Sequence, residues 1–122
     1  MQKDIDLKEV IENLNTSITK FREAELGTKE FVRAKRIMIV RFEKALKTIK
    51  SDMSMVKNQL LGLNIEIKEA KRSNDVNYYE QLNQEMECFQ KTLDYLKGKL
   101  NTVNDLIFAT GVGEDVYPNS AK

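Results

Sequence analysis

The sequence of 122 residues contains no histidine and a single cysteine, Cys88. Without histidine, the chain lacks the side chain that most often acts as a general base near neutral pH. With one thiol and no imidazole, it also lacks the usual ligand sets for zinc and iron. We therefore expect no catalytic, cofactor-binding or metal-binding residues. One cysteine cannot form an intramolecular disulfide, which favours a reducing compartment.

Long apolar runs are also missing from the chain. The longest run, Ile37 to Val40, is far shorter than the roughly 20 residues that cross a bilayer. The start, Met1 to Asp6, lacks the basic and then apolar order of a signal peptide. We therefore expect a cytoplasmic protein that makes no membrane contact.

The residues that are present favour helices. Charged residues make up 32% of the chain and hydrophobic residues 41%, with only one proline and five glycines. This composition is typical of coiled coils and helical bundles. Together with the length, it predicts a single all-α domain over residues 1–110.

The clearest pattern lies between Tyr79 and Ile107, where apolar residues alternate at spacings of three and four. They are Tyr79, Leu82, Met86, Phe89, Leu93, Leu96, Leu100, Val103 and Ile107. Such a stripe is the seam of a coiled coil and needs a partner helix. The preceding segment supplies a matching set, Phe42, Ala45, Ile49, Met53, Val56, Leu60, Leu63, Ile67 and Ala70. The two sets are symmetric about the polar turn 73–75, so we predict a long antiparallel helical hairpin with helices at about 29–72 and 75–109.

A shorter N-terminal helix is expected at about 5–26, with an apolar stripe of Leu7, Ile11, Leu14, Ile18 and Phe21. Gly27 and Thr28 predict a turn, because glycine tolerates a left-handed helix end and threonine caps the next helix. One continuous rod is the alternative, since glycine costs only about 1 kcal/mol inside a helix. The turn would let the first helix cover a second stripe of the hairpin, Val32, Ile39 and Leu46. The result would be a three-helix bundle at the base, two helices beyond about Ile49, and a flexible tail at 111–122.

Charge is distributed unevenly along the chain. Eight basic and two acidic residues lie between Thr28 and Lys50. Five of the basic residues face away from the predicted seam, and we call them the basic face: Lys29, Arg33, Arg36, Lys44 and Lys47. Such a face can follow a phosphate backbone. The alternative is a solvated face near the acids Glu9, Glu12, Glu23 and Glu25 of the first helix.

Apolar residues outside the seam point to self-association through the two-helix half. Leu61, Ile65 and Cys88 do not belong to the predicted seam, so another helix could cover them. We expect a homo-oligomer, either a dimer or a dimer of dimers, although a foreign protein could occupy the same surface. Scattered surface residues are the other interpretation.

These patterns favour two classes of function. The first is a non-catalytic protein-interaction module, such as a helical scaffold, adaptor or inhibitor, that acts through helix faces on a protein partner. The alternative is a nucleic-acid accessory protein in replication, recombination or packaging that uses the basic face. An enzyme is the least favoured class.

Overall fold

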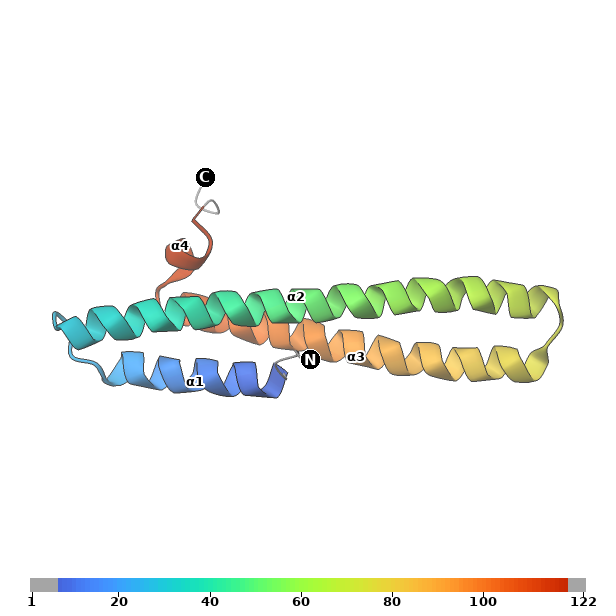
Figure 1. Ribbon diagram of the computed structural model, residues 1–122, viewed down its shortest axis with the longest axis horizontal. Helices are drawn as coiled ribbons and strands as arrows, with labels where there is room; N and C mark the ends of the chain where they lie inside the picture. The colour runs from blue at the N-terminus through green and yellow to red at the C-terminus, as the bar shows by residue number, and fades with distance from the viewer. Residues whose placement is uncertain (1–6, 119–122) are drawn as a thin grey trace, which may run out of the picture. The chain divides into compact units, whose positions relative to one another are not determined.

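The structure is a computed structural model and describes residues 7–118. It contains four helices: α1 (Leu7–Glu23), α2 (Lys29–Arg72), α3 (Val76–Ala109) and α4 (Gly113–Val116). No strand occurs within these residues. The predicted all-α fold is confirmed, with α2 and α3 forming the helical hairpin and α1 packing on α2 (Figure 1).

The chain divides into two compact units. We call the described residues 7–49 and 100–118 the basal unit, and residues 50–99 the hairpin unit. The basal unit contains α1, α4 and one part each of α2 and α3. The hairpin unit contains the other parts of α2 and α3 and the turn that joins them. The expectation of one domain stays a prediction.

The turn between α1 and α2 is present, so the continuous rod is ruled out. α1 ends at Glu23, earlier than the predicted residue 26, and the predicted start at Ile5 lies outside the described residues. Gly27 has a φ of 88°, in the left-handed region that favours glycine. The Phe31 amide donates a hydrogen bond of 3.1 Å to Oγ1 of Thr28. This bond caps α2 and fixes the point at which the helix begins.

The core of the basal unit combines residues from all four helices. Its buried apolar members are Val10, Leu14, Ile18, Met38, Phe42, Ala45, Leu46, Ile49, Val103, Ile107, Val112 and Val116. α1 buries Val10 and Ser17, which the predicted stripe omits, whereas Leu7 and Ile11 are half-buried. A helix in a bundle buries a wider arc of side chains than a helix in a two-helix coiled coil. The predicted stripe included only the residues that a two-helix seam would bury.

The predicted second stripe of α2 behaves differently from the expectation. Leu46 is buried and Ile39 is half-buried, but Val32 is 54% exposed. α1 lies along Ala34 and Ile37 of α2. At about 100° per residue, Val32 is far round the helix from Ile37. The first helix therefore packs on a different flank of α2 from the one that was predicted.

The C-terminal segment departs from the predicted flexible tail. Gly111 has a φ of 78° and ends α3, and the short helix α4 follows. Val112 is 0% exposed and Val116 is also buried. The Tyr117 hydroxyl donates to Oδ1 of Asn104 at 2.5 Å. Gly111 and Pro118 favour the end of a helix, but two buried valines one turn apart anchor residues 112–117. Residues 119–122 lie outside the described part.

The hairpin unit follows the predicted register closely. Leu63, Ile67, Ala70 and Leu82 form a buried cluster, against which Tyr79, Met86 and Phe89 pack. At the turn, Asn74 has a φ of 59°, and the Tyr78 amide donates to Oδ1 of Asp75 at 3.2 Å. Asparagine tolerates this conformation and aspartate caps the start of α3. The pairing predicted near the turn is therefore confirmed.

Candidate interaction surfaces

The basic face lies on α2 in the basal unit. All five side chains, Lys29, Arg33, Arg36, Lys44 and Lys47, are exposed. None of them forms a salt bridge with an acid of residues 7–118, whereas the neighbouring Lys35 pairs with Asp115 at 3.9 Å. The acids of α1 therefore do not neutralise this face by direct contact.

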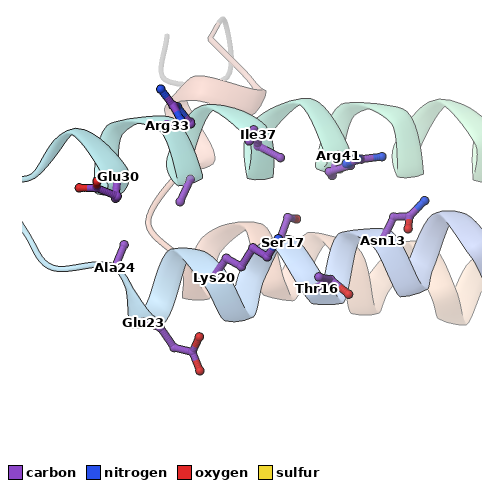
Figure 2. Close-up of a pocket in the computed structure, with 11 residues that line it drawn as sticks. Asn13, Thr16, Ser17, Lys20, Glu23, Ala24, Glu30, Arg33, Ile37 and Arg41 are labelled. Atoms are coloured by element: carbon purple, nitrogen blue, oxygen red, sulfur yellow. The ribbon is translucent and has the colours of Figure 1, made fainter.

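A groove of about 510 Å³ runs between α1 and α2 in the basal unit (Figure 2). Four small side chains are among its lining residues, namely Thr16, Ser17, Ala24 and Ala34. Arg33 points away from α1 and Glu23 points away from α2, so two of the charged side chains diverge from the groove. The groove thus has a neutral floor and mixed charges around it.

The buried polar group beside this groove is already satisfied. The Ser17 hydroxyl donates to the Leu14 carbonyl at 2.7 Å, within its own helix. No group of three or more carboxylate or cysteine side chains that could hold a metal ion occurs in residues 7–118. The nearest cations, Lys20 and Arg41, line the groove from different helices. This geometry offers a shallow contact surface and brings no pair of reactive groups together.

A second groove, of about 380 Å³, lies between α2 and α3 in the hairpin unit, and we call it the hairpin groove. Its lining consists of Asn58, Gln59, Gly62, Leu63, Glu66, Tyr78, Leu82, Glu85 and Phe89. The apolar side chains come from the core cluster and form the floor. Glu66 on α2 and Glu85 on α3 supply two carboxylates, and no basic residue lines the groove. The hairpin groove is therefore apolar at its base and acidic in charge.

A hydrogen bond crosses the hairpin groove. The Tyr78 hydroxyl donates to Oε2 of Glu66 at 2.7 Å. This bond raises the pKa of Tyr78 above its usual 10.0, because the proton is shared with a carboxylate; partial desolvation and the charges of Glu66, Glu85 and Glu69 add to the effect. The arrangement places Glu66 in a defined position on the groove rim.

The pKa values of two other tyrosines shift in opposite directions. Hydrogen bonding with Asn83 and then with Lys71 lowers the pKa of Tyr79, and the Lys71 ammonium lies 5.2 Å from the centre of its ring. Burial raises the pKa of Tyr117 in the basal unit. Tyr78 is the tyrosine whose shift arises from an acid in the hairpin groove.

All three residues predicted for self-association are exposed. Leu61 and Ile65 lie one turn apart on α2 and are 63% and 60% exposed. Each lies two positions from the buried Leu63, and two positions are about 200° around the helix. Both side chains therefore face away from the core. Cys88 is exposed on α3, one helical turn after Glu85. Self-association through these three residues stays a prediction.

The hairpin groove was missed in the sequence analysis. The seam pattern contains the floor residues Leu63, Leu82 and Phe89 but neither Tyr78 nor Glu66. The signal was available in the spacing: Gln59, Gly62 and Glu66 recur every three or four residues beside the seam of α2. Polar residues at this spacing are also typical of a solvated helix face.

Comparison with known proteins adds no relative. No family model, no curated protein and no solved structure matches this chain. None of the helices within residues 7–118 has an apolar stretch that could cross a bilayer.

Proposed function

We propose that this chain is a non-catalytic protein-interaction module of the cytoplasm, a helical scaffold, adaptor or inhibitor that binds a protein partner through its helix faces. The observation that carries the proposal is the hairpin groove, in which two exposed carboxylates and the half-buried Phe89 lie above the buried side chains of Leu63 and Leu82. Grooves between helices commonly bind a further helix. The absence of histidine and of a second cysteine supports a role without catalysis.

Cross-linked capture from cell extract tests this proposal. The full chain is the bait, Glu66→Lys with Glu85→Lys is the groove variant, and Lys97→Ala on the exposed surface of α3 is the matched control. We expect at least one protein other than the bait itself to be retained by the bait and the control and lost from the groove variant. Identical captured sets from all three baits would reject the groove as the binding surface.

The second candidate function is nucleic-acid binding, favoured by the basic face. Five exposed cations on one side of α2, without acids in contact, can neutralise phosphates in a sequence-independent way. A mobility shift with single- and double-stranded DNA over a series of salt concentrations tests it. Binding that weakens steeply with salt would support it, and no shift at low salt would remove it.

A further inference from the structure

The charge of the hairpin groove restricts what can occupy it. Glu66 and Glu85 stand on opposite helices, and no lysine or arginine is among the lining residues. The Tyr78 hydroxyl holds the Glu66 carboxylate by a hydrogen bond of 2.7 Å. An occupant with apolar residues between positive charges would complement both the floor and the rim.

Gly62 leaves one side of the groove accessible to another helix. The groove floor is formed by Leu63, Leu82 and Phe89, and the groove volume is about 380 Å³. At Gly62 on the rim, a Cβ atom would meet nothing within 4 Å. A position without a side chain lets the backbone of another helix approach closely. Side chains on one face of that helix can then reach Phe89, the half-buried member of the floor.

A surface of this chemistry exists on the chain itself. Val40 is 56% exposed on α2 in the basal unit, where it lies between Arg36 and Lys44 of the basic face. Arg33, Arg36, Val40, Lys44 and Lys47 follow one another at spacings of three and four, so they share one side of the helix. An apolar residue with two cations before it and two after it is a small cationic amphipathic face.

We propose that the hairpin groove of one copy binds the basic face of α2 from a second copy. Val40 of the second copy lies against the half-buried Phe89, and the arginines and lysines of the second copy lie against Glu66 and Glu85. This inference rests on the proposed function, because it names the partner of the same groove. Since exposed ion pairs are individually weak, the association is concentration-dependent and sensitive to salt.

A charge-swap experiment tests the pairing. Analytical ultracentrifugation of the full chain over a concentration series should show a mass above that of the 14.1 kDa monomer. Association should be at least about tenfold weaker at 1 M salt, because the Debye length is then about 3 Å and the charges are screened from one another. Two variants reverse the charges: the groove variant Glu66→Lys with Glu85→Lys, and the face variant Arg33→Glu with Arg36→Glu and Lys44→Glu. Each alone should be monomeric, because its two surfaces then carry the same sign. An equimolar mixture should associate again, because opposite signs meet between the two variants.

Restored association also shows that both variants are folded, and circular dichroism of each alone checks the helix content. A matched control, Leu61→Glu with Ile65→Glu, changes the outer side of α2 and should associate like the unmodified protein. The proposal is overturned by a monomer at every concentration, by variants that associate unmixed, by a mixture that stays monomeric, or by loss of association in the control alone. If association fails but a different protein still requires the groove in the capture experiment, the proposed function stands and only this partner is wrong.

Discussion

Tyr78 on α3 and Glu66 on α2 are joined by a hydrogen bond of 2.7 Å, with the phenol as donor. This bond keeps the proton on the phenol and raises the pKa of Tyr78 above 10.0. We expect Glu66→Gln to lower the pKa of Tyr78 toward that ordinary value, because the carboxylate charge is removed. NMR titration of the Tyr78 ring carbon measures it, with Glu80→Gln as an exposed control on α3. An unchanged pKa in Glu66→Gln would mean that the bond does not persist in solution.

The same shift predicts how stability depends on pH. Because the pKa of Tyr78 is raised in the folded state, its contribution is present below the unfolded value of about 10 and is lost as the pH rises through the folded value. Tyr79, whose pKa is lowered, has the opposite dependence. Comparing the unmodified protein with Tyr78→Phe cancels the Tyr79 effect. The stability difference between them should shrink above pH 10, as measured by urea unfolding at a series of pH values.

The packing of the hairpin unit predicts a contrast between two substitutions on α3. Leu93 is buried and Lys97, one turn away, is exposed. Leu93→Ala should reduce the free energy of unfolding by about 2–5 kcal/mol, because it leaves a cavity in the seam. Lys97→Ala should change it by less than about 0.5 kcal/mol. Thermal melts of both variants decide the matter, and equal shifts would mean that the seam is wrongly placed.

The C-terminal segment should be protected rather than flexible. Val112 is fully buried, and its amide donates to the Ile107 carbonyl at 3.2 Å. Val112→Ala should cost about 1–3 kcal/mol and speed hydrogen exchange across 112–117. Glu114→Ala, on the exposed side of α4, is the control. Exchange at the rate of an unfolded peptide in the unmodified protein would contradict the packing of this segment.

Nucleic-acid binding, if it occurs, should depend on the basic face. Arg33→Glu with Arg36→Glu and Lys44→Glu should abolish a salt-dependent mobility shift, because phosphates are then repelled. Helicity should be unchanged, since all three side chains are exposed. Lys91→Glu on α3 is the control, and it should weaken binding far less. Equal loss in both variants would indicate attraction to net charge and not to this face.

The hairpin could be predicted because its signal is local and repeated. The alternating spacing from Tyr79 to Ile107 sets one helix face, and the turn 73–75 fixes which residues of α2 meet it. The side of α2 that receives α1 could not be predicted in the same way. The stripe of Val32, Ile39 and Leu46 has only three members, and α1 instead lies along Ala34 and Ile37.

The candidate surfaces were harder to predict than the fold. The basic face was identified correctly as an exposed set, because charge and spacing are both visible in the sequence. The hairpin groove depends on the distance between α2, which carries Gly62 and Glu66, and α3, which carries Tyr78. The packing of the two helices sets that distance. The C-terminal segment was mistaken for a tail since glycine and proline signal the end of a helix but not what the following valines contact.

Cys88 is the one thiol of the chain, and it is exposed on the hairpin unit. A maleimide or nitroxide reagent will therefore attach at a single known position without any substitution. Each copy carries the label at the same place on α3. In an assembly of two copies, the distance between the labels reports directly where their hairpin units lie.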